Sequence, residues 1–565
     1  MEKDVHARLK AAPLSGPGNL DRRDAGAACA LIALPLALYL KAAAQFWSGD
    51  DTQILKHTLS HSLAGILTVP AEWRELSWLY FTPLVDLSTK LDLSLFGLEP
   101  HGWYLRHLLV LGVAASLLYV FLRGWVGRVA SAAAALFLLA GPPVAEVARQ
   151  LWARHYVEGL AFALAALLLF RRAVARGSWP AALAAGASGL AAMLGKEVYA
   201  VVPLVALALP CETFRRRLRA ALPLVAALAI YLPWRHAMVG YWGGIGKGAE
   251  SLLEPARRTA TSLGTFPAAL AGMPAAAGLA LAVLALVLLR PSLPQSAMIV
   301  FVAALVLAPL SVLRDAPAGR YALVPVVAAA ALAAAAAEAG LCAGGVRGAL
   351  GVLLLAGILV PAAVKGRAVF AAAAPLAARS RTEALFFERQ SARGDVLYHP
   401  VEPGWYFEGL AWLRSRSHGR VGGSVVYDAS VLCDGAGRDH IFAFEAASGD
   451  VVRDPPGPAA EIASVCSHLD RMMPISADLT YRESTLTWRL GPDQSGTWAF
   501  LSDEAAPFSV AREGSLFIRF TGDVNLRVRH ETADGRLGLS PALTLHVRDG
   551  SGEASLTESR KTLER

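Results

Sequence analysis

The sequence predicts a polytopic α-helical membrane domain followed by a soluble, mixed and mainly β C-terminal domain. Composition is the first reason: 55% of the 565 residues are hydrophobic and only 17% are charged, whereas soluble chains carry about a quarter charged residues. The mean hydropathy of +0.44 is the second. The third is the uneven charge, which is sparse before about residue 366 and dense after it. These features divide the chain into an integral membrane part and a soluble tail.

Long apolar runs predict about eleven membrane-spanning helices, because a helix of roughly 20 apolar residues crosses a bilayer. Some runs are short or contain proline, and alanine-rich stretches such as 328–337 suit close helix packing in lipid. We expect a cytoplasmic segment over 1–25, a membrane domain over 26–366 and a soluble domain over 367–565. The predicted spans are 27–46, 104–122, 129–143, 157–170, 180–195, 198–210, 220–236, 264–289, 296–313, 321–341 and 348–366.

Basic residues between the spans predict their orientation. They recur at alternate ends of the spans, and the positive-inside rule places such loops in the cytoplasm. The N-terminus is then cytoplasmic, and the C-terminal domain lies outside. The net charge of +8 is largely explained by these loops and does not indicate nucleic acid as a partner, while the Ala/Arg-rich composition favours a bacterial cell membrane. The residues concerned are Arg22, Arg23, Arg123, Arg128, Arg171, Arg172, Arg176, Arg215, Arg216, Arg217, Arg219, Arg290 and Arg347.

The first outer loop, 47–103, is too long to be only a connector. Its stretch 52–67 has apolar residues at helical spacing, which predicts an amphipathic helix lying in the membrane interface. A second apolar-rich piece covers 84–98. The alternative is that both pieces are helices that pack beneath the loop, and this stays open whether or not the loop is catalytic.

The C-terminal domain begins with helix-like sequence over 367–392 and then mixes strand patterns with a helical stretch, 458–472. From Asp478 onward strand follows strand, separated by turn signals such as Asp534-Gly535, which is typical of a small β-sandwich. Cys433 and Cys466 could form a disulfide if the domain faces an oxidising compartment. Such a domain could bind a sugar or a partner, or it could simply stabilise the protein. The predicted strands are 395–398, 421–433, 440–444, 486–490, 497–501, 516–521, 524–529 and 543–547.

Asp50 and Asp51 follow the first predicted span at its outer end, where ionisable groups are costly and usually functional. Two adjacent carboxylates suit a general base that deprotonates an acceptor hydroxyl, or ligands for a divalent metal. The alternative is a solvated pair that caps a helix starting near Thr52. We prefer Asp51 as the catalytic residue, since Asp50 is as well placed to cap.

Three further clusters of ionisable residues fall on the same predicted face. A lysine there can contact phosphate as a point charge, and an arginine can contact it through two hydrogen bonds. Each cluster alone is also explained by solvated or interfacial charges, but their agreement with Asp50 and Asp51 favours a shared site. The clusters are Glu146 with Arg154, Lys196 with Glu197, and Arg314 and Asp315 followed by Arg320 and Tyr321.

At these positions the chain resembles the GT-C superfamily of integral membrane glycosyltransferases, which use polyprenyl-phosphate sugars. The resemblance points to bacterial relatives of the O-mannosyltransferases and to lipid A aminoarabinose transferases, and it covers roughly residues 26–340. No single piece is specific to the family, but the pieces taken together in this order are fairly specific. In chain order the pieces are Gly49-Asp50-Asp51, Phe81-Thr82-Pro83-Leu84, Leu95-Phe96-Gly97-Leu98 with Pro100, Pro142 with Glu146 and Arg154, Gly195-Lys196-Glu197 with Pro203, and Arg320-Tyr321 with Pro325.

The resemblance implies a GT-C-type fold and inverting transfer of a sugar from a polyprenyl-phosphate donor in the membrane, on the outer face. Inversion needs one displacement, so a single base suffices. The phosphate is then held by Lys196 and Arg320, while Glu146 and Arg154 organise the pocket. Whether a divalent metal takes part stays open. The implied roles are catalytic for Asp51 and Asp50, and substrate-binding for Glu146, Arg154, Lys196, Glu197, Arg320 and Tyr321.

Some positions depart from the family pattern. Gly141-Pro142 stands where the family often has His-Pro, and Gln150 stands where it often has Trp. The family's His and Asn at the second span correspond to Tyr104 and His107, and no TPR array follows the membrane domain. These departures leave the sugar open, and also the acceptor, which is a protein hydroxyl, a glycolipid or a surface polysaccharide.

Two other functions remain as alternatives. A transporter or flippase of lipid-linked sugars would place ionisable residues at mid-span depth and would show internal repeats. A non-catalytic membrane anchor that presents the β-rich tail would not need clustered ionisable residues on the outer face. Neither mid-span charges nor internal repeats are clear in the sequence, and ionisable residues do cluster on the outer face, so we expect a glycosyltransferase.

Overall fold

The computed structural model divides into two compact units. The first consists of Met1–Gln45, Ile66–Pro70 and Leu79–Pro375, and the second of Phe46–Gly65, Ala71–Trp78 and Leu376–Arg565. The predicted span 296–313, the first part of the span 264–289, Gly49, Arg290, Arg314 and Asp315 lie outside the described residues. The structure describes residues 21–48, 50–77, 79–209, 211–240, 272–289, 319–374, 382, 386, 395–399, 424–434, 440–445, 450–470, 473–482, 485–492, 495–502, 505–517, 522–547 and 551–556.

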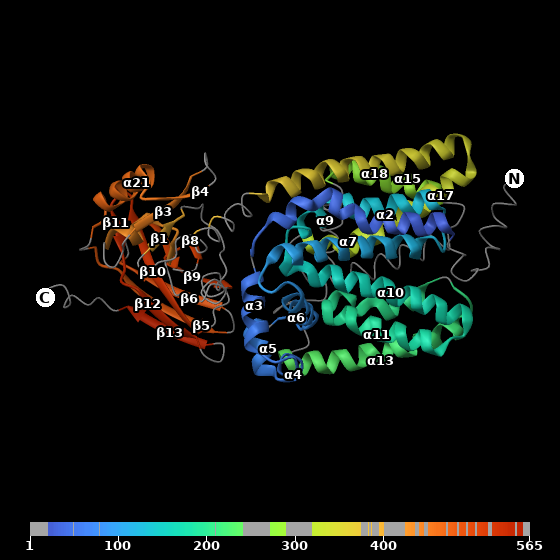
Figure 1. Cartoon of the computed structure of the whole chain (residues 1–565), viewed down its shortest axis with the longest axis horizontal. Coiled ribbons are helices and arrows are strands. Elements are labelled where there is room, and N and C mark those ends of the chain that lie inside the picture. Colours follow the sequence, from blue (N-terminus) through green and yellow to red (C-terminus); the bar gives the residue numbers. More distant parts are fainter. Residues whose placement is uncertain are drawn as a thin grey trace. The chain divides into compact units, whose positions relative to one another are not determined.

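The first unit is a bundle of apolar helices that run side by side (Figure 1). Helix α10 packs against α7 and α11, α11 packs against α13, and α17 packs against α8 and α18. The helices are α2 (Arg22–Tyr39), η1 (Leu40–Ala44), α6 (Leu84–Phe96), α7 (Pro100–Leu122), α8 (Arg128–Ala140), α9 (Pro142–Val147), η2 (Leu151–Ala153), α10 (Arg154–Arg176), α11 (Trp179–Gly195), η3 (Glu197–Val201), α12 (Val202–Ala208), α13 (Phe214–Val239), α15 (Ala275–Leu289), η6 (Gly319–Ala322), α17 (Leu323–Ala343) and α18 (Gly345–Ala372).

Five helical segments among the described residues are long and apolar enough to cross a membrane. Every predicted span except 296–313 overlaps a described helix, but several of these helices are short, so the count of about eleven spans stays a prediction. Helix α18 continues past residue 366, where the membrane domain was expected to end. The five segments are Arg22–Ala44, Pro100–Leu122, Phe214–Val239, Gly319–Ala343 and Gly345–Ala372.

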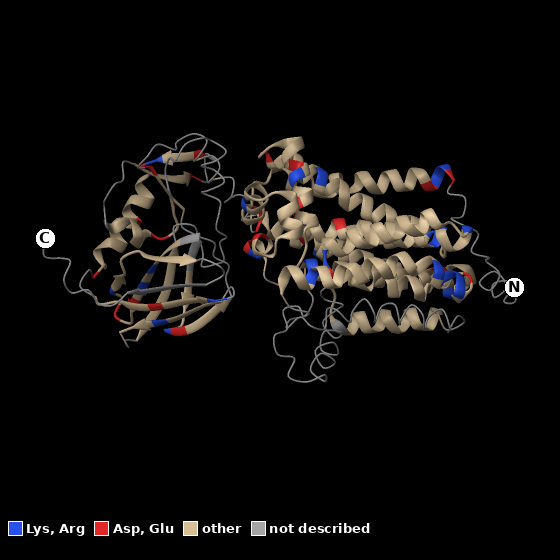
Figure 2. Cartoon of the chain, turned by 90° about the horizontal axis from the view of Figure 1, so that it is seen from below, with Lys and Arg blue, Asp and Glu red and all other residues tan. Residues whose placement is uncertain are grey.

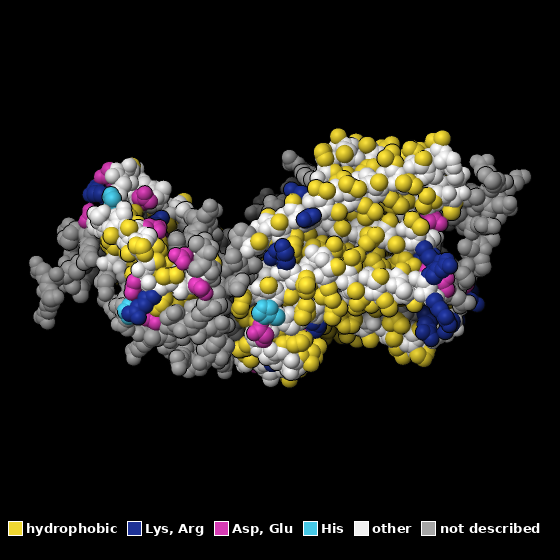
Figure 3. All heavy atoms as spheres, turned by 45° about the horizontal axis from the view of Figure 1, so that its top comes forward, with side chains coloured by type: hydrophobic (Ala, Val, Ile, Leu, Met, Phe, Trp, Pro, Cys, Tyr) yellow, Lys and Arg dark blue, Asp and Glu magenta, His cyan; other side chains and the backbone are white. Residues whose placement is uncertain are grey.

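The surface of the helical unit is compatible with an integral membrane protein. Hydrophobic side chains cover the face seen in Figure 3, and lysine and arginine side chains gather at one end of it. Large apolar side chains such as Leu222, Ile230 and Val364 are more than half exposed, as they are when they face lipid. Figure 2 shows that charged residues lie mostly toward the two ends of the helices.

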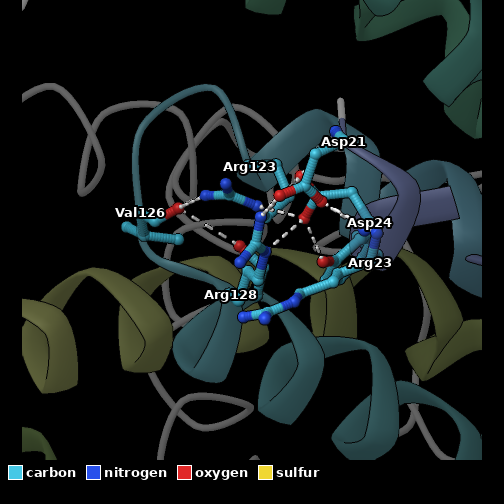
Figure 4. Close-up of polar contacts among 8 residues, drawn as sticks. Asp21, Arg23, Asp24, Arg123, Val126 and Arg128 are labelled. Atoms are coloured by element: carbon cyan, nitrogen blue, oxygen red, sulfur yellow. Dashed lines mark hydrogen bonds and ion pairs between the residues drawn. The ribbon is translucent and has the colours of Figure 1, made fainter. Parts of the chain in front are cut away.

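A buried carboxylate fixes the N-terminal end of α2 (Figure 4). Asp24 is 2% exposed, and its Oδ1 accepts hydrogen bonds from the Nε atoms of Arg123 and Arg128, each at 3.0 Å, and from the Tyr119 hydroxyl at 2.7 Å. Asp21 and Asp24 also form a capping box over the first turn of the helix. The two arginines expected as orientation signals therefore also neutralise a carboxylate that would be costly to bury alone.

The predicted amphipathic helix over 52–67 is interrupted in the structure. Helix α3 (Asp51–Ser60) ends at His61, which has an extended backbone, and α4 (Leu63–Thr68) and α5 (Pro70–Leu76) follow. The His61 ring contacts two carboxylates after the break, with Nε2 2.8 Å from Glu75 and Nδ1 3.4 Å from Glu72. Helix α3 belongs to the second unit, as do most of α5 and the first part of α4.

The second unit also contains a four-stranded sheet with the order β2-β1-β3-β4. Strand β1 is parallel to β2 and β3, and a helix and a 3-10 turn are joined by the Cys433–Cys466 disulfide, which the sequence suggested. The strand predicted over 421–433 is confirmed only for β2, because the chain then forms a 3-10 helix. The elements are β1 (Asp395–Tyr398), β2 (Ser424–Val426), η7 (Ala429–Asp434), β3 (His440–Glu445), β4 (Asp450–Arg453) and α21 (Pro456–Ser467).

Two antiparallel sheets that share one apolar core complete this unit. One has the order β11-β10-β7-β8 with β12 also paired to β10, and the other has the order β13-β5-β6-β9. Trp488 of one sheet meets Phe500 of the other edge-on, with ring centroids 5.4 Å apart. The strands are β5 (Ser476–Arg482), β6 (Thr485–Gly491), β7 (Gly496–Ser502), β8 (Ala505–Val510), β9 (Glu513–Phe517), β10 (Gly522–Thr532), β11 (Leu537–Leu539), β12 (Leu543–Val547) and β13 (Ser551–Leu556).

Candidate functional site

Six of the predicted site residues belong to the first unit, and they lie at helix ends. The structure brings three of them, Lys196, Arg320 and Tyr321, into one group with three further aromatic side chains from separate parts of the chain. We call this group the cation–aromatic cluster: Lys196, Arg320, Tyr80, Trp152, Tyr156 and Tyr321. Lys196 follows α11, Trp152 lies in η2, Tyr156 lies in the first turn of α10, Arg320 and Tyr321 lie in η6, and Tyr80 precedes α6.

Lys196 lies near two tyrosine rings. Its Nζ is 3.3 Å from the centroid of the Tyr80 ring and 5.1 Å from that of Tyr156, which is within the range of cation–π attraction. The residue is only 7% exposed, and its Nζ is 3.7 Å from a carboxylate oxygen of Glu197. An ammonium group carries three donors, so it can bind an anionic oxygen while the rings fix its position.

Arg320 is held by aromatic rings in the same way. Its guanidinium carbon is 4.4 Å from the Trp152 ring centroid and 4.5 Å from that of Tyr321, and its Nη2 donates to the Tyr321 hydroxyl at 3.1 Å. The Tyr321 ring meets Tyr156 edge-on at 5.8 Å. Since Tyr156 also flanks Lys196, one tyrosine connects the two cations that were expected to bind phosphate.

Glu197 fixes the segment that carries Tyr80. Its Oε1 accepts the backbone N–H of Phe81 at 2.9 Å and lies 3.5 Å from Nε of Arg235, whose Nη2 donates to the carbonyl of Leu79 at 3.1 Å. Both neighbours of Tyr80 are thus held by side chains from η3 and α13. These contacts give Glu197, which was expected to bind substrate, a positioning role in the described structure.

Glu146 lies against the segment that precedes Arg320, and not beside Arg154. A Cβ added to Gly319 would come within 2.3 Å of both Glu146 carboxylate oxygens, and Gly319 has a φ of +55°, so only glycine suits this position. Gln150 donates to Glu146 Oε1 at 3.3 Å. The predicted pair of Glu146 and Arg154 therefore separates into two different sets of contacts.

Arg154 belongs to a buried ionic network with residues that sequence reasoning missed. It is 3% exposed, its Nη1 is 2.5 Å from Asp92 Oδ2, and it also donates to the hydroxyl of Thr89. Arg106 contacts Asp92 as well, and its Nη2 is 2.9 Å from Glu158. Two arginines and two carboxylates thus neutralise one another where α6, α7 and α10 meet, so the Arg154 charge is balanced within the protein.

Helix α6 shows the signal that could have revealed this network. It buries the polar residues Asp86, Thr89 and Asp92, while Leu91 and Leu95 on its other face are about half exposed. A helix with polar residues inside and apolar residues outside is the reverse of the soluble pattern and suits a lipid environment. The spacing of three residues between these polar positions is visible in the sequence, within the piece 84–98 that was noted only as apolar-rich.

Glycines let α10 and α11 approach closely beneath the cluster. A Cβ added to Gly195 would lie 2.9 Å from the backbone oxygen of His155 and 3.0 Å from Gly159 Cα. These are backbone contacts that cannot give way without moving a helix, and small residues of this kind are typical of helix contacts in membranes. Gly195 precedes Lys196, so this contact also sets the position of the lysine.

We expect Gly195→Ala to destabilise the protein by about 1–3 kcal/mol, because the new methyl group overpacks a backbone contact. The measurement is thermal unfolding of the purified protein in detergent. Gly26→Ala is the matched control, since a Cβ there meets nothing within 4 Å and the residue also lies in an apolar helix. Equal unfolding temperatures for the two variants would contradict the close approach.

Asp50 and Asp51 belong to the second unit. Asp51 is 4% exposed, and its Oδ2 accepts the backbone N–H of Ser48 at 2.9 Å. Asp50 occupies the N-cap position of α3, but within the described residues its side chain makes no capping hydrogen bond. The choice of Asp51 had rested on Asp50 as a cap, which the structure does not show, while the Asp51 carboxylate is oriented by the Ser48 N–H.

Several buried polar atoms around the cluster make no hydrogen bond within the described part of the chain. Such atoms are uncommon in native proteins and indicate a place where water or a polar ligand binds. No group of three or more His, Cys, Asp or Glu side chains among the described residues could hold a metal ion. The atoms are Arg149 Nε, Gln150 Oε1, His155 Nδ1 and Glu197 Oε2.

The arrangement of the cluster suits an anionic ligand with an apolar or sugar-like part. Two cations supply charge-assisted hydrogen bonds for phosphate oxygens, and the aromatic rings provide flat apolar surfaces around them. The network of Arg106, Arg154, Asp92 and Glu158 carries no net charge, so it does not offset the charges of Lys196 and Arg320. No protein-family model, no curated protein and no solved structure matches this chain.

Proposed function

We propose that the protein is a GT-C-type glycosyltransferase that moves a sugar from a polyprenyl-phosphate donor to an acceptor on the extracytoplasmic face of the membrane. The acceptor is a protein hydroxyl, a glycolipid or a surface polysaccharide. The observation that carries the proposal is the pair of aromatic-held cations, Lys196 and Arg320, at the ends of apolar helices. A lipid-linked phosphate needs this combination, because its chain lies in the bilayer while its charge needs cations.

The proposed reaction is a single displacement at the anomeric carbon. The acceptor oxygen forms the new bond to the sugar as the bond from the sugar to the phosphate oxygen breaks, and the electron pair leaves with the polyprenyl phosphate. The leaving phosphate gains a negative charge, which Lys196 and Arg320 stabilise. The proton of the acceptor hydroxyl passes to a carboxylate, for which Asp51 or Asp50 is proposed.

The C-terminal domain supports the proposed orientation. Cys433 and Cys466 form a disulfide, and disulfides persist mainly in oxidising compartments outside the cytoplasm. Within the helical unit, arginines such as Arg123, Arg128 and Arg176 lie at or next to helix ends on the side of the N-terminal end of α2, which agrees with a cytoplasmic N-terminus. Both features fit a protein of a bacterial cell membrane whose tail is extracytoplasmic.

A flippase for lipid-linked sugars is the main alternative, and it would bind the same headgroup. Transport favours charged residues at mid-span depth, whereas the charged residues of this unit lie mostly toward the helix ends (Figure 2). A membrane anchor for the β-rich tail would need neither buried cations nor orphaned polar atoms. The transferase is therefore the function that the site supports best.

Replacement of the aspartates tests the proposed base. In proteoliposomes supplied with polyprenyl-phosphate sugars, we expect Asp51→Asn to lower sugar transfer by about 10²-fold or more, as loss of a general base does. Asp50→Asn removes the same charge from the neighbouring position, so the variant with the larger loss identifies the base, and we expect that to be Asp51→Asn. Unchanged transfer in both variants would remove this pair from the mechanism.

A further inference from the structure

His155 lies among the groups of the cation–aromatic cluster, just before the predicted span 157–170. It follows Trp152 by one helical turn, and its ring centroid is 4.6 Å from that of Tyr156. Its backbone oxygen would be 2.9 Å from a Cβ added to Gly195, the residue before Lys196. His155 thus lies in the chain between two residues that contact the two cations, since Trp152 contacts Arg320 and Tyr156 contacts Lys196.

The imidazole of His155 is partly buried, and its Nδ1 atom is buried and incompletely bonded. Its Nδ1 atom makes no hydrogen bond within the described residues, and such a buried atom costs about 1–3 kcal/mol unless a ligand or water satisfies it. Burial lowers the pKa of His155 well below its ordinary value, and the charges of Lys196, Arg320 and Arg154 lower it further, while the Trp152 carbonyl opposes them. The ring is therefore neutral in the empty site at pH 7.

We infer that His155 is a third phosphate-binding residue, beside Lys196 and Arg320. The inference rests on the proposed function, because the phosphate is that of the polyprenyl-phosphate donor. An anion bound between the two cations offsets the charges that keep the imidazole neutral. The ring then takes up one proton from solution, and its N–H donates a hydrogen bond to a phosphate oxygen. Because the proton comes from solution, no carboxylate of the protein has to supply it.

Donor binding is then coupled to one proton. The protonated ring binds the anion more tightly, so affinity rises as the pH falls through the pKa of His155 in the complex. The affinity stops rising below the lower pKa that His155 has without a bound anion. One linked proton limits the change to about tenfold per pH unit. The imidazole thus adds to phosphate recognition mainly on the acid side of neutrality.

The test measures binding of farnesyl methyl phosphate to the full chain in lipid nanodiscs. This phosphodiester keeps a single charge between pH 5 and 8, so only the protein titrates. For the wild type we expect the Kd to fall by about threefold or more from pH 7.5 to pH 5.5, and for His155→Gln by less than about twofold. His101→Gln, at an exposed position of α7, is the matched control and should keep the dependence of the wild type.

Two outcomes would overturn the role of His155: a wild-type Kd that does not change with pH, or a pH dependence that persists in His155→Gln. Binding at pH 7.5 close to that of the wild type shows that the variant is folded, since the ring is mostly neutral there. Sugar transfer is measured on the same samples. If binding depends on pH through His155 but no sugar is transferred, the proposed function is overturned and the role of His155 in phosphate binding stands. If sugar is transferred but binding does not depend on pH through His155, only the role of His155 is overturned.

Discussion

Lys196→Ala and Arg320→Ala are each expected to lower the rate of sugar transfer by about 10²- to 10³-fold. The donor phosphate gains a second negative charge as its bond to the sugar breaks, so each cation stabilises the transition state more than the bound donor. We therefore expect kcat to fall more than KM rises. Initial rates in proteoliposomes, measured over a range of donor concentrations at pH 7, give both constants.

Two sets of variants make this result specific. Arg172→Ala removes an exposed arginine from the other end of α10 and is expected to leave the rate within about twofold of the wild type. Lys196→Arg and Arg320→Lys keep the charge but change its geometry, so a partial loss would show that the aromatic-held position matters as well as the charge. Rates near those of the wild type in both alanine variants would contradict the assignment of the phosphate site.

Asp92→Asn is expected to destabilise the protein by about 3–5 kcal/mol, the cost of leaving a buried ion without its partner. Asp92 is 0% exposed and contacts both Arg106 and Arg154. Removing its charge takes a countercharge from Arg154 and leaves Glu158 as the described carboxylate partner of Arg106. Unfolding of the purified protein by heat or denaturant in micelles measures the loss.

A surface ion pair provides the comparison for this variant. Glu212→Gln breaks a partly exposed pair with Arg216, whose Nη1 is 3.3 Å from Glu212 Oε2, and it should cost less than about 1 kcal/mol. The double variant Asp92→Asn with Arg154→Gln should recover part of the stability, because it removes the stranded charge as well. Equal unfolding of Asp92→Asn and Glu212→Gln would show that the network does not stabilise the helical unit.

The sequence predicted the elements that depend on local patterns. The apolar runs located the described helices of the first unit, because a helix in lipid must be apolar over its length. The alternating strands 486–490, 497–501, 524–529 and 543–547 are confirmed, since each buries one face in the core of the two sheets. Short elements were harder: β8, β11 and β13 were missed, and the region 421–433 changes from strand to 3-10 helix within a few residues.

The site was predicted in part. Lys196 and Arg320 were chosen because a charge between apolar runs is costly, and the structure brings them together around Tyr156. Tyr80 and Arg235 were missed, because an aromatic ring or an arginine near a helix end has many ordinary explanations. Their contribution depends on contacts with Lys196 and Glu197, which are distant in sequence. No local pattern carries that information.

The most direct measurement follows the sugar itself. Purified wild-type protein in proteoliposomes is given a polyprenyl-phosphate sugar with a labelled sugar and a bacterial cell-envelope fraction as acceptor. We predict that the label leaves the lipid and becomes bound to an acceptor, with release of polyprenyl phosphate, and that the Lys196→Ala/Arg320→Ala variant shows neither. Label that stays on the lipid for every donor tried, or that crosses to the other leaflet with the phosphate bond intact, would contradict sugar transfer.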